Sequence, residues 1–309
     1  MGSIKWQVVH CLTALQTYGQ SRHAARAAHQ EKFGIYSVRT MQNYCELSVS
    51  FAAWCQSEGL IEQRLADVSP LAAAAFLKAL RSKGRSPATV NTYACAIKKL
   101  DQGMRVVGWR RRDAEALVPD YAGRRADVVA DPYSVEDAAR LIAALLALDP
   151  QYGYVAKLQR LAGLRVDEAV HLQAHWIKSD GSEVVLPADE NTHAKGGRPR
   201  RIPVLPQHAA EVAALREQGL RHADGHLFHD RQSLTAAVKR AASALAPRLG
   251  IEVGDGTHSL RKTYANELYD HLVSVRNLPA NLARQIVTEA LGHSRLEVLK
   301  AYVDPKQHN

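Results

Sequence analysis

The second half of the chain contains basic side chains and a C-terminal phenol that are suited to chemistry on a phosphate. Guanidinium groups grip phosphate oxygens through paired hydrogen bonds, and imidazole and ammonium groups can move protons. A tyrosine hydroxyl can attack phosphorus when a neighbour accepts its proton or cations stabilise its anion. Each residue type is common, but the ordered set predicts a nucleophilic site around one phosphate. Its members are Arg165, Lys195, His258, Arg261, His293 and Tyr302.

The middle of this set has the pattern of a helix start. His258 and Arg261 are three residues apart, so on a helix they lie on one face. Asp255-Gly256 predicts the preceding turn, and Thr257 is the expected N-cap. A helix N-terminus attracts anions, so the position suits a phosphate. His-x-x-Arg alone is also typical of a solvated helix face.

Two further cations have neighbours that fit the same site. Arg165 follows Gly163-Leu164, and Glu168 lies three residues later. The carboxylate is expected either to orient the guanidinium toward a phosphate or to form a surface ion pair with it. Lys195 precedes a Gly196-Gly197 turn, where it would protonate a leaving oxygen or remain a solvated turn residue.

The C-terminal phenol belongs to a segment with the pattern of a short helix. Gly292 predicts the end of one helix, and Ser294 to Glu297 fits a capping box that begins the next. Asp304-Pro305 predicts its end, so Tyr302 lies about two turns beyond His293. A short terminal helix would let a nucleophile enter and leave a site. The alternative is a tyrosine that only packs.

The first 118 residues have the pattern of an all-α domain. Ser37, Ser69 and Ser86 each precede apolar residues at helical spacing, and proline follows the last two. The segment from Ile4 to Tyr18 is also apolar and mixed, and no segment of this domain gives a strand signal. We expect four or five helices here.

The last part of the chain, residues 133–309, has a different pattern. Short strands are predicted at 183–186 and 201–204 around the glycine turn, with helices before and after them. The intervening residues 119–132 contain proline, glycine and arginine without a period, and form the expected basic linker. The fold class is therefore mainly α with a small antiparallel sheet, an all-α domain followed by an α+β domain.

The composition fits a basic globular protein. The 309 residues include 40 Lys and Arg against 31 Asp and Glu, for a net charge of +9. This charge attracts polyanions such as nucleic acid, although charge alone is weak evidence. No apolar run reaches the ~18 residues of a membrane span. No signal-peptide pattern is present either, so a cytoplasmic location without membrane contact is expected.

The cysteines and acidic residues give no sign of a metal. Cys11, Cys45, Cys55 and Cys95 form no Cys-x-x-Cys pair, and no histidine cluster completes a zinc site. Buried, reduced thiols are expected on helices. The chain also lacks a carboxylate cluster suited to magnesium and a Gly-Lys-Ser/Thr phosphate loop, so neither a metal nor a nucleotide cofactor is expected.

The chain resembles the tyrosine recombinases, also called phage integrases, over roughly residues 134–303. The segments that carry the resemblance are Ala162 to Ala169, Lys195-Gly196-Gly197, His258-Ser259-Leu260-Arg261, Leu291-Gly292-His293 and Tyr302. Residues 37–102 are more loosely similar to the family's core-binding domain. The resemblance implies a two-domain clamp around duplex DNA and a homotetramer on two DNA sites that passes through a Holliday junction. It also implies an enzyme of phage or bacterial mobile DNA.

The resemblance further implies a mechanism. Tyr302 would attack the scissile phosphodiester, form a 3′-phosphotyrosyl bond and release a 5′-hydroxyl. Arg165, Arg261 and His293 would stabilise the phosphorane. His258 would assist proton transfer from Tyr302, and Lys195 would protonate the leaving oxygen. Neither metal nor ATP would be needed, because the covalent bond retains the phosphodiester energy.

Other cations predict contacts with the DNA backbone, or else with solvent. They are Lys98, Lys99, Arg110, Arg111, Arg112, Arg124, Arg125, Arg198, Arg200 and Arg201. Two alternatives to a site-specific recombinase stay open. One is a type IB topoisomerase-like or telomere-resolving enzyme, which the compact length and small helical first domain disfavour. The other is a catalytically inactive DNA-binding regulator on the same fold, which the complete set of catalytic residues disfavours.

Overall fold

A computed structural model describes residues 2–20, 25, 34–109, 115–118, 131–188, 199–251, 254 and 256–293. The chain divides into two compact units, Met1–Val128 and Val129–Asn309. Most of the predicted basic linker, residues 119–130, lies outside the described residues. Within the described residues, no helix is long and apolar enough to cross a membrane.

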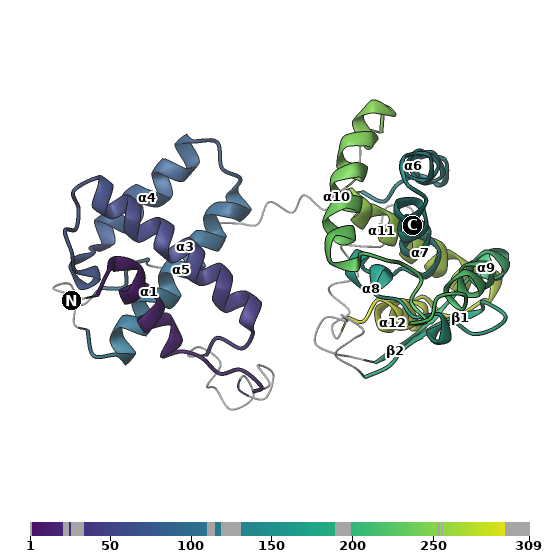
Figure 1. The fold of residues 1–309 in the computed structure, drawn as a ribbon, viewed down its shortest axis with the longest axis horizontal. Coiled ribbons are helices and arrows are strands. Elements are labelled where there is room, and N and C mark those ends of the chain that lie inside the picture. The colour runs from purple at the N-terminus through teal and green to yellow at the C-terminus, as the bar shows by residue number, and fades with distance from the viewer. Residues whose placement is uncertain are drawn as a thin grey trace. The chain divides into compact units, whose positions relative to one another are not determined.

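The first unit is built from helices (Figure 1). They are α1 (Ile4–Thr13), α3 (Val38–Ser57), the 3-10 turn η1 (Leu65–Asp67), α4 (Pro70–Ser82) and α5 (Pro87–Val106). The hydroxyls of Ser37, Ser69 and Ser86 accept hydrogen bonds from backbone N–H groups in the first turns of α3, α4 and α5. Each bond satisfies a donor that the helix itself leaves open. The prediction of an all-α first domain is therefore confirmed.

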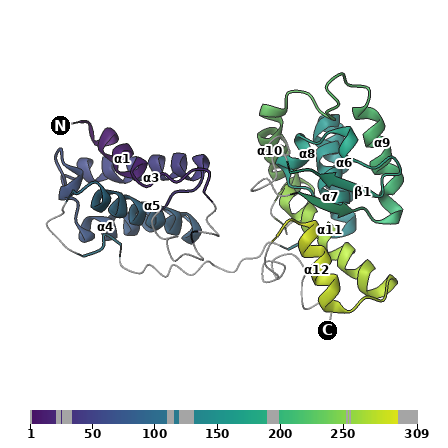
Figure 2. The same cartoon turned by 90° about the horizontal axis from the view of Figure 1, so that it is seen from below.

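The core of the first unit is formed where α1, α3 and α5 pack together. Its fully buried side chains include Phe51, Ile97 and Leu100. In Figure 2, α1 and α3 lie on one side of the unit, with α4 and α5 on the other. Each helix buries one apolar face, so the helices form a single core.

The thiols of this unit are only partly as predicted. Cys11 and Cys55 are buried, and burial raises the pKa of each thiol to about 12. Cys45 is partly buried, whereas Cys95 is exposed on α5. The prediction of four buried thiols is wrong for Cys95, because it lies on the solvent face of its helix.

The second unit begins with helices and returns to helices after a small sheet (Figure 1). Its first half contains α6 (Val135–Leu148), α7 (Pro150–Ala162), α8 (Val166–Val170), η2 (Ala174–Trp176), β1 (Glu183–Leu186) and β2 (Arg200–Pro203). Its second half contains η4 (Pro206–His208), α9 (Ala209–Gly219), α10 (Arg231–Arg248), α11 (Thr257–Asp270), the π-helical turn η5 (His271–Val275) and α12 (Ala280–Ala290).

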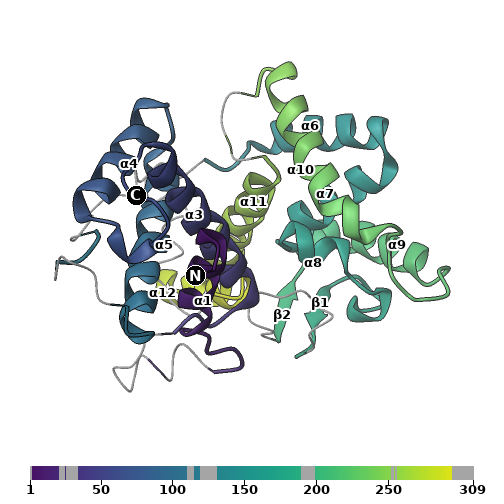
Figure 3. The same ribbon diagram turned by 60° about the vertical axis from the view of Figure 1, so that its left-hand side comes forward.

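The two strands form an antiparallel sheet, shown side by side in Figure 3. Val184 pairs with Ile202, and Leu186 pairs with Arg200. Because side chains alternate along a strand, these four residues lie on the same, buried face. The predicted fold class is confirmed, and the second strand begins one residue earlier than predicted.

The main core of the second unit surrounds α7 and α11, which pack against each other. The side chains of Leu158, Tyr264 and Leu268 are nearly or fully buried there. The helix α12 contacts both α11 and β2, and Figure 1 shows it beside β2. The helix α12 therefore connects α11 with the sheet.

Candidate active site

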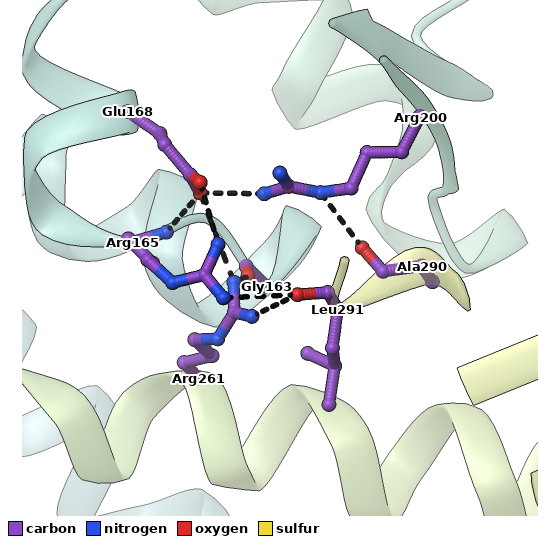
Figure 4. Close-up of polar contacts among 7 residues, drawn as sticks. All are labelled: Gly163, Arg165, Glu168, Arg200, Arg261, Ala290 and Leu291. Carbon is purple, nitrogen blue, oxygen red and sulfur yellow. Dashed lines mark hydrogen bonds and ion pairs between the residues drawn. The ribbon is translucent and has the colours of Figure 1, made fainter. Parts of the chain in front are cut away.

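Glu168, on the short helix α8, is the centre of a cluster of three arginines (Figure 4). Its side chain is fully buried. One carboxylate oxygen accepts a hydrogen bond from Arg165 Nη1 at 2.7 Å. The other accepts from Arg200 Nη2 at 2.5 Å and lies 3.8 Å from Arg261 Nη1. Three guanidinium groups around one carboxylate leave an excess of positive charge.

The turn between α7 and α8 sets the position of Arg165. Gly163 ends α7 with a φ of 56°, and a Cβ built on it would lie 2.2 Å from the Tyr264 ring. Both the left-handed backbone and the close ring require glycine here. Arg165 is then the N-cap of α8, and its backbone N–H donates to Glu168 at 2.7 Å. The Gly163-to-Glu168 motif therefore forms one compact turn.

Arg261 joins three distant segments of the second unit. It lies on α11, and its side chain is fully buried. Its Nη1 donates to the carbonyl of Gly163 and its Nη2 to the carbonyl of Leu291. The same Leu291 carbonyl accepts a longer hydrogen bond, 3.4 Å, from Arg165 Nη2. The two arginines thus converge at the C-terminal end of α12 (Figure 4).

The charges fix the ionisation of the carboxylate. Burial acts to raise the pKa of Glu168, but the opposing effects of Arg200, Arg261 and Arg165 outweigh it and lower the pKa to about 2. Glu168 is therefore ionised at neutral pH. It holds the guanidinium groups in fixed orientations before any substrate arrives, which is the arrangement needed for electrostatic catalysis.

A cavity of about 510 Å³ adjoins this cluster. Arg165 and His258 both line it, and 21% of the Arg165 side chain is exposed. The full lining consists of Gln159, Arg165, Val166, Asp167, Lys239, Ser243, Gly256, Thr257 and His258. Arg165 is thus the link between the buried arginine cluster and an open site.

The structure places four of the six predicted catalytic residues. Arg165 and Arg261 meet at Leu291, and Arg165 shares the cavity with His258. His293 follows Gly292, which has a φ of 65°, and its backbone N–H donates to the Thr288 carbonyl at 3.0 Å. Lys195 and Tyr302 lie outside the described residues, as does the predicted capping box after His293.

One local prediction at this site is wrong. Thr257 was the expected N-cap of the His258 helix, but the N-cap is Gly256 and Thr257 is the first helical residue. Gly256 has a φ of 49°, a conformation that glycine adopts without strain. The helix therefore begins without a hydrogen bond from an N-cap side chain.

Comparisons with known proteins agree with these motifs. The model of the Integrase family matches residues 133–267. The tyrosine recombinase XerC of Mesorhizobium japonicum is 24% identical over 249 residues, covering 77% of this chain and 75% of that protein. The family match and the likeness to XerC support a place for this chain among the tyrosine recombinases.

Solved recombinase structures share its fold. The XerH site-specific recombinase in a post-cleavage complex with its difH substrate gives a TM-score of 0.62 at 16% identity, over 98% of this chain and 92% of that one. A lambda integrase dimer bound to a core site gives 0.65 at 15% identity, over 93% and 96%. A lambda integrase tetramer bound to a Holliday junction gives 0.62 at 16% identity, over 92% and 75%.

Among the cations predicted to contact DNA, Arg200 requires a correction. Its side chain is 5% exposed and bonded to Glu168, and its Nε donates to the Ala290 carbonyl at 3.1 Å. It is part of the arginine cluster and cannot contact DNA from the surface. Arg201 is exposed and pairs with Glu183.

The remaining predicted DNA contacts stay predictions. Lys98 and Lys99 lie half-buried on α5, where Lys99 donates to Gln102 at 2.9 Å. The others lie outside the described residues: Arg110, Arg111, Arg112, Arg124, Arg125 and Arg198.

The role of Arg200 could have been found from strand alternation. Ile202 is apolar, and an apolar strand residue usually faces the core, so the residue two positions earlier would face inward as well. The excess of arginines near the glycine turn favoured the surface assignment instead. An arginine on the buried face of a strand requires a buried acid, and Glu168 is that acid.

Removing the Glu168 charge should destabilise the protein. We expect Glu168→Gln to lower the free energy of unfolding at pH 7 by about 3 kcal/mol or more, because it leaves buried guanidinium groups without a counter-charge. Urea denaturation measures this loss. Glu217→Gln is the control, since this exposed glutamate pairs with Arg216 at the surface. The control should change the stability by less than about 1 kcal/mol.

The effect should also depend on pH in a defined direction. The pKa of Glu168 is lower in the folded chain than its ordinary value of 4.5, so the ionised form stabilises the fold above pH 4.5. This stabilisation is lost as the pH falls toward 2, at about 1.4 kcal/mol per pH unit. The stability gap between wild type and Glu168→Gln should therefore narrow below pH 4.5. A gap that stays constant from pH 7 to pH 3.5 would contradict an ionised, arginine-bound Glu168.

Proposed function

We propose that the chain is a site-specific DNA recombinase that cleaves and rejoins duplex DNA through a covalent bond between Tyr302 and a 3′-phosphate. The observation that carries the proposal is the convergence of Arg165 and Arg261 on the Leu291 carbonyl around ionised Glu168. This cluster holds excess positive charge beside an open cavity. A phosphodiester that gains negative charge in its transition state would be stabilised there.

Arg165 and Arg261 differ in burial, which suggests different roles at the phosphate. Arg165 is partly exposed and lines the cavity, so it would make the direct contact with the non-bridging oxygens. Arg261 is fully buried, and it would hold the Leu291 carbonyl and contribute its charge from beneath. Two guanidinium groups at one phosphate are worth more in this partly desolvated site than on the surface.

His258 and Lys195 would carry out the two proton transfers of the reaction. His258 lines the cavity next to Arg165 and would accept the proton of Tyr302 as it attacks. Lys195 would protonate the 5′-oxygen that leaves, and His293 would donate a hydrogen bond to the phosphorane. Because the covalent bond stores the phosphodiester energy, rejoining would need neither ATP nor a metal.

The expected partner is double-stranded DNA held by both units of the chain. A homotetramer on two DNA sites would carry out strand exchange, as the lambda integrase tetramer on a Holliday junction suggests by its assembly. We expect a cytoplasmic, DNA-associated location for this bacterial or phage-encoded protein.

Capture of a covalent adduct tests the proposal. The full chain is incubated with fragmented genomic or plasmid DNA of the cell that encodes it, and the mixture is denatured. DNA that remains attached to protein is then sequenced to define the cleaved site. A suicide duplex with a nick near that site should trap the adduct. Duplex binding without any adduct would favour an inactive regulator, and relaxation of plasmids that lack the site would favour a topoisomerase.

DNA affinity should depend strongly on salt. Several Lys and Arg contacts with phosphate release counterions, so the logarithm of the association constant should fall linearly with the logarithm of the salt concentration. We expect a slope of about −4 or steeper for the full chain on a duplex with the cleaved site, measured by fluorescence anisotropy. A slope near zero would contradict a clamp that surrounds DNA.

A further inference from the structure

The cavity beside Arg165 is larger than one phosphate requires. Its volume of about 510 Å³ falls in the range of roughly 300–1,000 Å³ that holds drug-sized ligands, whereas a phosphate has five heavy atoms. Arg165 and His258 form only part of its lining. Gln159, Lys239 and Ser243 contribute other parts of the lining and have no role in the catalytic set.

The helix α10 presents a polar face to this cavity. Thr235, Lys239 and Ser243 are four residues apart, so they lie on one face of the helix. Thr235 Oγ1 donates to Asp167 Oδ1 at 3.1 Å and ties this face to α8. Ser243 Oγ lies near the start of α11, since a Cβ built on Gly256 would be 3.3 Å from it. Lys239 therefore lies on α10 between Thr235, which is bonded to α8, and Ser243, which is close to the start of α11.

The other side of the cavity also suits an anion. Gly256 is the N-cap of the 14-residue helix α11 and provides no side-chain cap, and the N-terminus of a helix carries partial positive charge. The lining contains the cations Arg165 and Lys239, against the single carboxylate of Asp167. The Asp167 carboxylate is engaged by Thr235.

An unpartnered polar atom points independently to a ligand. Gln159 lies on α7, is 1% exposed and lines the cavity. Its Oε1 is buried and has no hydrogen-bond partner. Buried polar atoms in native proteins nearly always have a partner, so a water or ligand that donates a hydrogen bond is expected to contact this oxygen. The amide would reach an anion through a bridging water.

We propose that the α10 side of the cavity is a second phosphate subsite, in which Lys239 and Ser243 bind the DNA phosphate next to the scissile one. The inference rests on the proposed function, since it takes Arg165 and His258 as the holders of the scissile phosphate. Lys239 supplies the charge, and the Ser243 hydroxyl and the α11 N-terminus donate hydrogen bonds. Gln159 contacts the phosphate through a bridging water. The subsite would fix the register of the DNA strand relative to the nucleophile.

The test pairs a charge-removing variant with a charge-free DNA linkage. Duplexes with the cleaved site carry a single neutral methylphosphonate at each position flanking the scissile bond. Binding is measured in a Tyr302→Phe background, so that cleavage does not interfere. Lys239→Gln should weaken binding of the natural duplex about tenfold and reduce the magnitude of the salt slope by about 1. At one flanking position, the methylphosphonate should make the affinities of the Lys239→Gln protein and its Lys239 parent equal.

Arg240→Gln is the matched control, because Arg240 is exposed on the same helix and does not line the cavity. Its effect should be the same on natural and substituted duplexes. Gln159→Leu should keep the melting temperature of the free protein or raise it, since no hydrogen bond is lost, and should weaken binding of the natural duplex.

The outcomes separate the two proposals. Adduct formation by the Tyr302 protein, with no flanking position at which the effect of Lys239→Gln disappears, would overturn the subsite and leave the recombinase function intact. Absence of any adduct would overturn the recombinase function and the subsite with it. We expect the effect of Lys239→Gln on affinity to disappear at one methylphosphonate position, and the effect of Arg240→Gln to stay the same at every position.

Discussion

Tyr302→Phe should abolish the covalent protein–DNA adduct while leaving duplex affinity within about twofold of the wild-type value. The phenol oxygen is the proposed nucleophile, and phenylalanine removes this one atom while keeping the ring. The ordinary pKa of a phenol, ~10, means that the reaction also depends on the surrounding cations. The adduct is measured by denaturing electrophoresis with a suicide duplex, and the affinity by fluorescence anisotropy.

The control for this prediction is the same chemical change elsewhere in the second unit. Tyr154 lies on α7, is partly buried and is not part of the arginine cluster or the cavity lining. Tyr154→Phe should form the adduct at the wild-type rate. An adduct of undiminished yield with Tyr302→Phe would show that another side chain attacks the phosphate.

Arg261→Ala should cause the second large loss, in both stability and rate. The side chain is fully buried and donates hydrogen bonds to the carbonyls of Gly163 and Leu291. Its Nη1 lies 3.8 Å from a carboxylate oxygen of Glu168. Truncation leaves the Gly163 carbonyl without this donor and the Leu291 carbonyl with only the long hydrogen bond from Arg165, and it removes a buried charge paired with Glu168. The free energy of unfolding should fall by about 3–5 kcal/mol. The loss of a charge beside the phosphate should slow adduct formation by a factor of about 10³.

Arg261→Lys separates the two effects. The lysine keeps the charge but cannot donate to both carbonyls as a planar fork. We expect a folded protein whose single-turnover cleavage is slower by about 10², measured at a temperature where both proteins are fully folded. Arg221→Lys, at an exposed position, is the control and should be neutral. A wild-type cleavage rate in Arg261→Lys would mean that the geometry at Leu291 is unimportant.

Local sequence signals were sufficient for most of the helices. The Ser-Pro pairs at 69–70 and 86–87 fix an N-cap and a first helical residue, and both act within one turn of backbone. The short strands were found because runs of β-branched and other apolar residues lie on either side of the predicted glycine turn. These features depend on neighbours in sequence, so the chain alone predicts them.

Contacts between distant segments were harder to predict. The glutamate that follows Arg165 was proposed to orient it, and the structure shows that contact, because three residues separate the pair. The inward position of Arg200 and the cavity-lining positions of Lys239 and Ser243 depend on tertiary packing. A sequence pattern gives the face of a helix or strand, but not what that face contacts. The prediction that Thr257 is the N-cap was wrong for a different reason, since Gly256 already adopts the backbone geometry of the N-cap.

Everything proposed for the mechanism requires that DNA becomes attached to one particular oxygen. The most direct measurement is to trap the adduct with a suicide duplex, digest the protein and the DNA, and map the modified peptide by tandem mass spectrometry. The account predicts a nucleotide joined through its 3′-phosphate to Tyr302, in a yield that falls when Arg165 or Arg261 is replaced. A nucleotide on any other residue, or a linkage through a 5′-phosphate, would contradict it.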